Sequence, residues 1–317
     1  MKKNAILGLL AQTSIHAGTG HNTGIIDLPI QREGHNGWPC VFGSAVKGAL
    51  RSHAEQSKAG ERKYTKEEYV KEVKQADEIV AVYGPPQSES SEHAGAVLVT
   101  DARLLFLPVR SLTSQFKWVT CPYALKKYKQ TCAMLGISGV DFPVPGVPEH
   151  DERTSAIVDD KATKQEVFLE EYRFEVEQQD LTKLITALAS LMRKGKESSS
   201  LENALRKQLI IVSNDDFTYL AQHATPVNAH IALDSATKTV LNGALWYEET
   251  LPPETLLYCG LSAHAARNGG EFNADQVLQF VLRLFQEKPW LQLGGNETVG
   301  MGWCAVSDIQ SIPAEEG

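Results

Sequence analysis

The residues best suited to chemistry gather near the start of the chain, between Thr13 and Arg51. An apolar run ends at His16, a glycine-rich loop follows, and Asp27 then stands alone among apolar neighbours. An imidazole can transfer protons near neutral pH, although a lone histidine at a strand end is more often a structural residue. Asp27 lies in a loop that ends in proline, where an aspartate can also be an ordinary turn residue. The residues alone leave both alternatives open.

A second candidate site follows the loop directly. The segment from Ser44 to about Lys58 predicts a helix, with the Ser44 hydroxyl as its N-cap. Ser44, Lys47 and Arg51 share one face of that helix because they are spaced three and four residues apart. A helix N-terminus beside a lysine and an arginine suits a phosphate group. The alternative is that Lys47 and Arg51 are only solvated surface residues.

These motifs, together with others further along the chain, resemble the RAMP superfamily. More narrowly, they resemble the repeated backbone subunit of the type III-B (Cmr) RNA-guided CRISPR effector complex. The similar segments are Ser14–Gly20, Ile26–Glu33, Gly37–Pro39, Phe42–Ser44 with Lys47–Arg51, Asp101–Leu105 with Pro108–Ser111, and Ala244–Glu249, followed by a glycine-rich loop near the C-terminus. The resemblance therefore spans nearly the whole chain.

The resemblance implies a catalytic set of three residues. Asp27 corresponds to the family's cleavage aspartate and would hold a divalent metal ion, for which Mg²⁺ is the expected choice. His16 would orient the scissile phosphate or transfer a proton beside it. An acidic residue near the cleavage site corresponds to Glu248, although Glu249 is an equally possible equivalent from sequence. An ordinary solvated glutamate remains the alternative for Glu248.

The resemblance also implies an RNA-binding set. Ser44, Lys47 and Arg51 would hold the guide-RNA backbone, and glycines in two loops would let backbone N–H groups approach phosphate. These glycines are Gly18, Gly20, Gly294, Gly295, Gly300 and Gly302. The second loop is not a nucleotide-binding P-loop, because Met301 and Gly302 stand where that motif requires lysine and serine or threonine.

The implied function is that of a subunit repeated along a guide RNA. Each copy would bind crRNA, contact further copies of itself and other Cmr subunits, and cut the complementary target RNA at regular intervals. Copies would stack head to tail, as in helical assemblies. Two alternatives remain: a non-catalytic RNA-binding scaffold, and a stand-alone RAMP endonuclease that processes crRNA. Metal dependence and copy number would distinguish these hypotheses.

The pattern of strands and helices that must position these residues predicts an α+β fold. Strands with alternating apolar residues are interspersed with helices without βαβ regularity, which favours an antiparallel sheet. The resemblance implies a ferredoxin-like (RRM-like) core with insertions, all in one RAMP domain over residues 1–317. Residues 223–249 read as two extended arms around a turn, at the position of the family's protruding thumb hairpin. The basic residues that typical members carry on this arm are not found over 226–233.

Composition limits the class of protein. The 317 residues, 42% of them hydrophobic, are ample for a large core. Net charge is −8, but residues 1–75 hold 11 Lys and Arg against 7 Asp and Glu, a local excess of +4. A basic N-terminal part can still bind phosphates. The five cysteines form no C-x-x-C pair, which favours reduced thiols in the cytoplasm, and no stretch is long enough to span a membrane.

Overall fold

The structure is a computed structural model that describes residues 2–21, 24–86, 93–112, 114–147, 155–161, 166–192, 198–270 and 272–311. It is a mixed α/β fold in which twelve strands form one continuous sheet and two further strands form a separate hairpin. The strands of the large sheet are β1 (Lys3–Ala11), β2 (Cys40–Val41), β3 (Val97–Val99), β4 (Ala102–Ser111), β5 (Ser114–Thr120), β6 (Ser155–Val158), β7 (Glu166–Leu169), β8 (Tyr172–Gln178), β9 (Leu209–Ile211), β12 (Leu256–Ala263), β13 (Trp290–Gln292) and β14 (Trp303–Gln310).

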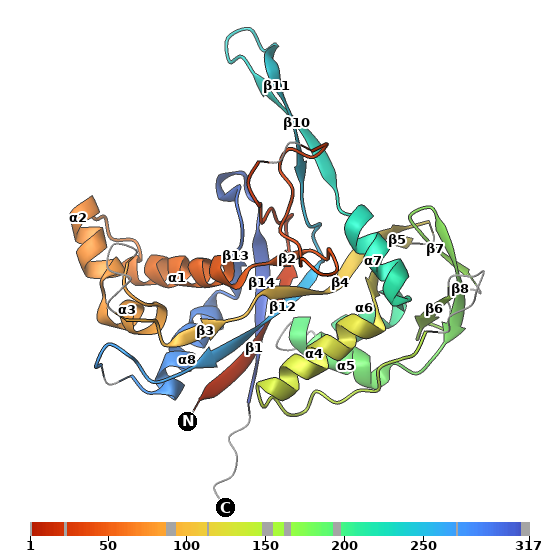
Figure 1. Cartoon of the computed structure of the whole chain (residues 1–317), viewed down its shortest axis with the longest axis horizontal. Helices are drawn as coiled ribbons and strands as arrows, with labels where there is room; N and C mark the ends of the chain where they lie inside the picture. The colour runs from red at the N-terminus through yellow and green to blue at the C-terminus, as the bar shows by residue number, and fades with distance from the viewer. Residues whose placement is uncertain are drawn as a thin grey trace, which may run out of the picture.

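The helices pack in two groups, one on each side of the sheet (Figure 1). Figure 1 shows α1, α3 and α8 on one side and α4, α5 and α6 on the other. The helices are α1 (Gly43–Ala59), α2 (Lys66–Tyr69), α3 (Asp77–Tyr83), α4 (Pro122–Met134), α5 (Thr182–Met192), α6 (Ser198–Gln208), α7 (Asn214–His223) and α8 (Ala274–Glu287). A single π-helical turn, Val70–Lys74, joins α2 to the segment before α3.

The centre of the sheet is the antiparallel order β14–β1–β12–β4. β1 is central because its residues alternate between two hydrophobic cores: Leu7 and Leu9 belong to one, and Ile6 and Leu10 to the other. Gly8 is required between them, because a Cβ there would collide with the Leu191 carbonyl at the end of α5. The sheet thus separates the two helix groups, and α5 packs directly onto β1.

The rest of the sheet turns back on itself. From β4 the order runs through β5, β9, β6, β8 and β7, and β7 returns to β4 through the pair Ser111 and Leu169. The sequence predicts an antiparallel sheet. The pairings β5–β9 and β6–β8 are instead parallel, so the observed sheet is mixed. The alternating residues over 166–176 predict a single strand from sequence, but the structure forms the hairpin of β7 and β8 there, with a turn at Glu170 in the left-handed region.

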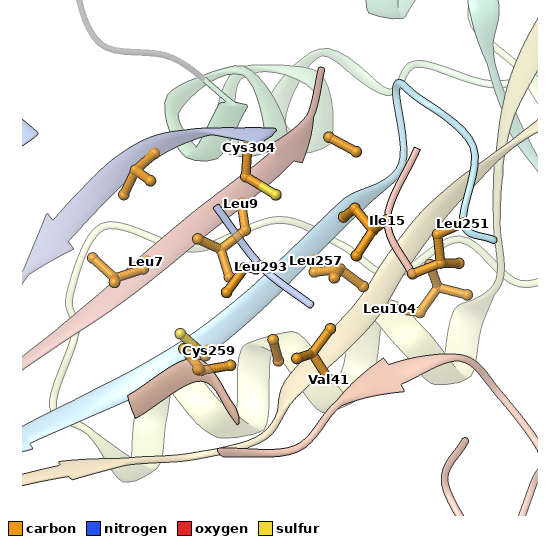
Figure 2. Packing of buried hydrophobic residues seen from close by; sticks show 14 of the residues in the cluster. Leu7, Leu9, Ile15, Val41, Leu104, Leu251, Leu257, Cys259, Leu293 and Cys304 are labelled. Carbon is orange, nitrogen blue, oxygen red and sulfur yellow. The ribbon is translucent and has the colours of Figure 1, made fainter. Parts of the chain in front are cut away.

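Figure 2 shows how the first core joins the central strands to the loop that follows β1. Leu9, Leu257 and Leu293 pack together with Ile15 and Leu251, all of them buried. Ile15 also pairs with Leu251 through backbone hydrogen bonds of 2.9 Å in both directions. The segment that carries His16 is therefore fixed by buried apolar contacts as well as by its backbone.

The predicted helix after the loop is confirmed, but Ser44 is not its N-cap. α1 begins one residue earlier, at Gly43, and its capping position, Phe42, makes no side-chain bond. The Asp101 carboxylate accepts instead from the Gly43 N–H at 2.7 Å. A helix N-terminus attracts a negative group, and here a distant carboxylate supplies it. The Ser44 side chain is left exposed at the start of α1.

The sequence also predicts a helix that starts at Thr65, with Glu68 completing a capping box, and stops before Gly84; the structure has this helix in three pieces. Thr65 and Glu68 form the capping box at the start of α2. The π-helical turn and a short non-helical link follow, and α3 ends at Tyr83 with Gly84 as its C-cap. Over 274–288 the apolar spacing predicts an amphipathic helix, and it is confirmed as α8, with Val277, Val281 and Phe285 buried on one face.

The two extended arms predicted within 223–249 form the hairpin of β10 (Val227–Leu233) and β11 (Val240–Glu249). Figure 1 shows that this hairpin projects away from the body of the molecule. Its outer part exposes apolar side chains: Ile231, Leu233, Val240, Leu241 and Leu245. Its inner end, at Glu248 and Glu249, is buried against the loop after β1.

All five cysteines are buried and free. Burial raises the pKa of the Cys40 thiol to about 12, with Glu33 and Asp101 adding to the effect. Within the described residues, the helices are too short or too polar for any of them to cross a membrane.

Candidate functional site

The loop that carries Asp27 is fastened to the inner end of β11. Leu28 donates to the Tyr247 carbonyl at 3.0 Å and accepts from the Glu249 N–H at 3.0 Å, which makes a short parallel bridge. Asp27 Oδ2 accepts from the Tyr247 N–H at 2.8 Å. The carboxylate is partly exposed, with one oxygen held by the backbone. Asp27 therefore lies where the projecting hairpin meets the body of the molecule.

His16 lies on the other side of the same strand end. Its Nδ1 is 2.8 Å from the Glu249 carbonyl oxygen. A carbonyl can only accept, so Nδ1 carries the proton in the neutral ring and Nε2 is left as the basic nitrogen. The ring is 8% exposed. Nε2 packs against Gly18, where a Cβ would lie only 2.6 Å from that nitrogen. A glycine at position 18 thus leaves room for the imidazole.

Glu248 turns its carboxylate toward His16. Oε1 is 3.5 Å from His16 Nδ1 and also accepts from the Asn296 amide, and Oε2 is 3.7 Å from His230 Nε2. The residue is only 4% exposed. Glu248 therefore links the loop after β1, the hairpin and the glycine-rich loop through one buried carboxylate.

The Glu249 carboxylate faces elsewhere. It pairs with Arg32, accepts from Thr225 Oγ1 at 2.6 Å, and accepts from the Ile30 N–H at 3.2 Å. Arg32 also donates to the Gly37 carbonyl at 2.7 Å and to the Ala221 carbonyl at 2.9 Å. These bonds hold the loop and the end of α7 against the base of the hairpin. Of the two glutamates that the sequence left as alternatives, only Glu248 turns its carboxylate toward His16.

The glycine-rich loop holds the backbone around His16 through hydrogen bonds. Gly295 donates to the His16 carbonyl at 2.8 Å, and Gly302 donates to the Ser14 carbonyl at 2.8 Å. Gly294 has φ +85°, and a Cβ there would collide with the His16 carbonyl oxygen. Gly302 has φ +86°, and a Cβ there would collide with the Leu293 carbonyl. These two positions accept only glycine without strain.

A narrow groove of about 400 Å³ runs beside this site. Its walls come from the loop after β1, from α1 and from the glycine-rich loop, and they consist mainly of small residues. The lining residues are Ala17, Gly18, Gln31, Ala45, Gly48, Ala49, Ser52, Gln292, Gly294 and Gly295. Such walls allow a phosphate backbone to approach the main chain closely. Gly20 and Gly300, also predicted to bind RNA, do not line this groove and have open space at their Cα.

Lys47 and Arg51 on α1 differ in how they are bonded. Arg51 donates to Glu55 Oε1 at 2.8 Å and to the carbonyls of Gly84 at 2.9 Å and Lys74 at 3.2 Å. These bonds favour a structural role, in which Arg51 ties α1 to the segments around α3. In the described part of the chain, no residue bonds the Lys47 ammonium. Burial lowers the pKa of Lys47, and the charges of Arg51 and Arg267 lower it further.

The structure thus brings together Asp27, His16 and Glu248 around the inner end of β11. Across the described ranges, no group of three His, Cys, Asp or Glu side chains is placed to hold a metal ion. His230 belongs to the same cluster, although the sequence does not point to it. Its closeness to Glu248 follows from the hairpin register, which pairs Asn228 with Glu248 and His230 with Trp246.

Comparison with known proteins identifies the family of the chain. The model of the RAMP superfamily matches residues 9–305. The chain is similar to the CRISPR system Cmr endoribonuclease Cmr4 of Pyrococcus furiosus, with 32% identity over 96% of this chain and 95% of that protein. It is also similar to the CRISPR system CMR subunit Cmr4 of Saccharolobus solfataricus, with 26% identity over 92% of each chain.

The similarity extends to solved structures. The crystal structure of oligomeric Cmr4 from Pyrococcus furiosus superposes with a TM-score of 0.69 and 26% identity, over 97% of this chain and 98% of that one. The overall fold is thus shared with Cmr4 over nearly the whole of both chains. The chain belongs to the RAMP superfamily.

Proposed function

We propose that this chain is the endoribonuclease backbone subunit of a type III-B (Cmr) CRISPR effector complex. Copies bind along a crRNA, contact one another and other Cmr subunits, and cut the paired target RNA at regular intervals. Similarity over nearly its full length to a Cmr endoribonuclease supports this proposal. The observation that carries it is the position of Asp27, a partly exposed carboxylate fixed to β11 beside His16 and Glu248.

The reaction is attack of a ribose 2′-OH on the adjacent phosphate, which forms a 2′,3′-cyclic phosphate, breaks the bond from phosphorus to the 5′-oxygen of the next nucleotide and releases that oxygen as a 5′-OH, with the 2′-OH giving up its proton. Asp27 presents one oxygen that is already oriented by the Tyr247 N–H and a second that can face the RNA. A divalent ion bound by one carboxylate together with phosphate and water oxygens matches the preference of Mg²⁺, and when bound it would stabilise the charge that develops on the phosphate. His16, whose Nδ1 is bonded to the Glu249 carbonyl, keeps a basic Nε2.

The RNA backbone is bound in the groove between α1 and the glycine-rich loop. The small residues of its walls let phosphates approach backbone N–H groups, and Lys47 supplies a positive charge on the adjoining helix. Ser44 is exposed at the start of α1 and extends this surface. Arg51 acts indirectly, by holding α1 in place. Sequence is read by base pairing between guide and target, not by the protein.

The scaffold of this site is a ferredoxin-like core, with the β10–β11 hairpin as its thumb, in one domain. Three features support this inference: the antiparallel order β14–β1–β12–β4, the position of α1 after β1, and the position of α8 between β12 and β14. The exposed apolar residues on the outer hairpin suit a wedge that is inserted between guide and target strands.

The proposal is tested with the guide-loaded complex and a complementary target RNA. Wild type and Asp27→Ala are compared in Mg²⁺ and in EDTA, with assembly and target binding measured in parallel. We expect EDTA and Asp27→Ala each to abolish the regularly spaced cuts, while target binding remains. Asp180→Ala is a matched control, because Asp180 is an exposed aspartate bonded to the Thr182 N–H at the start of α5, outside the site and the hairpin.

Regular cutting by Asp27→Ala would remove the catalytic assignment. The subunit would then be a scaffold for guide and target, with cleavage located elsewhere in the complex. A chain that cuts RNA alone, as a monomer and without metal, would instead indicate a stand-alone processing endonuclease.

A further inference from the structure

Glu248 is a buried carboxylate whose two oxygens face two different imidazoles. His16 Nδ1 lies 3.5 Å from Oε1, and His230 Nε2 lies 3.7 Å from Oε2. Both distances are long for hydrogen bonds but fall within the range of ion pairs. The neutral Asn296 amide, which donates to Oε1, is the remaining contact among the described residues. A carboxylate that is only 4% exposed requires more compensation than one amide supplies.

His230 is held in position from the opposite strand. It is paired with Trp246 in the hairpin register, and the two rings stack at 5.4 Å with an angle of 16° between their planes. Its Nε2 is shielded from solvent and has no hydrogen-bond partner in the described part of the chain. A buried ring nitrogen without a partner is costly, and the group that it faces is the Glu248 carboxylate.

We propose that His230 is a positioning residue of the cleavage site. Its imidazole Nε2 faces Glu248 Oε2 and fixes the carboxylate that also faces His16. The inference rests on the proposed function, because it assigns His230 to that same site. The other charged groups nearby are already engaged: Asp27 is bonded to the Tyr247 N–H from its loop, and Glu249 is paired with Arg32.

The arrangement couples the positions of the two histidines. They share one carboxylate, and each ring faces a different oxygen of it. His230 thus holds the Oε2 end of Glu248, so that Oε1 stays directed at His16 Nδ1 while the Glu249 carbonyl orients the same ring. Without His230, the Glu248 carboxylate loses the group at Oε2 and can turn away from His16.

The first test needs no cleavage. Imidazole NMR spectra of the full chain are recorded at one pH for wild type, His230→Gln and His230→Phe, and His16→Gln assigns the His16 signal. We expect both His230 variants to shift the ring signals of His16, because the carboxylate that faces this ring loses its second imidazole. His35→Gln is the matched control, because His35 is an exposed histidine that faces Glu33 instead. His16 ring signals that stay unchanged in both His230 variants would overturn the proposal.

The second test uses the guide-loaded complex. His230→Gln should slow single-turnover target cleavage about threefold to tenfold, with RNA binding and thermal stability unchanged. A purely structural role would lower thermal stability and RNA binding together with the rate, and that outcome contradicts the inference. If the His16 signals respond to His230 but even wild type does not cut RNA, the proposed function fails while the contact of Glu248 with both rings stands.

Discussion

Glu248 and Glu249 are consecutive residues at the inner end of β11, and both are buried, yet their carboxylates serve different purposes. Glu249 is satisfied by a guanidinium, a hydroxyl and a backbone N–H. Glu248 faces two imidazoles at ion-pair distance and one amide. Successive side chains of a strand point to opposite faces of the sheet, so one carboxylate meets the loop before β2 and the other meets the site.

This difference indicates a structural role for Glu249 and a chemical role for Glu248. A fully bonded carboxylate cannot change its partners without breaking the structure, whereas a carboxylate with incompletely satisfied oxygens can respond to charge at a bound substrate. Glu249 thus fixes the base of the hairpin, and Glu248 belongs to the candidate site.

The largest effect is expected from the supporting carboxylate. Glu249→Ala leaves the Arg32 guanidinium without its partner at the base of the hairpin, so the free energy of unfolding should fall by about 3–5 kcal/mol. Urea unfolding of the isolated chain measures this loss. Glu248→Ala is the matched variant, with an expected loss of about 1 kcal/mol. Equal losses in the two variants would mean that the two environments do not differ energetically.

Gly294, which lies against the His16 carbonyl, offers a second test of how the site is supported. Gly294→Ala places a Cβ against the His16 carbonyl at a backbone conformation with φ +85°, so stability should fall by about 3 kcal/mol. Gly300 has φ +84° but open space around it, and Gly300→Ala should cost about 1 kcal/mol. Thermal unfolding of the two variants separates the collision from the conformational strain. The collision has no role if both lose the same amount.

The site carboxylate should affect rate rather than stability. Glu248→Gln keeps the shape of the side chain and removes its charge, so target cleavage should slow about 10- to 100-fold while RNA binding is retained. Single-turnover cleavage by the guide-loaded complex measures the rate, and urea unfolding checks the fold. Wild-type cleavage by Glu248→Gln would show that Glu248, like Glu249, is only structural.

The sequence predicts elements whose signals are local. The apolar stripe of α8 and the capping box at Thr65 are readable because every residue involved lies within a few positions of the others. The arms of the hairpin are readable for the same reason. The start of α1 is not, because its capping group, Asp101, comes from a segment 58 residues away in sequence. Ser44, which has the right residue type for a cap, is therefore misassigned.

Side-chain roles in the site are harder to predict than its location. The choice between Glu248 and Glu249 depends on which face of β11 meets the body, and that is set by the bridge between Leu28 and Glu248. Sequence patterns do not point to His230, because the register of the hairpin alone decides which residues it contacts. From sequence, Arg51 is predicted to bind phosphate. In the structure its guanidinium donates instead to the backbone carbonyls of Lys74 and Gly84, which are distant in sequence.

Helix α1 carries a similar contrast between a bonded cation, Arg51, and a cation that no described residue bonds, Lys47. Substituting Lys47 is expected to have the smallest effect of these variants. Lys47→Met removes a cation that no described residue bonds, so the dependence of RNA affinity on salt should lose about one unit of slope, with stability unchanged. Arg51→Met removes bonds to three segments, so it should lower stability while changing the salt slope less. Binding of crRNA at several salt concentrations, with thermal unfolding of each variant, measures both. If Arg51→Met changes the slope as much as Lys47→Met and leaves stability intact, then Arg51 is released from its internal bonds when RNA binds, and both cations contact the backbone.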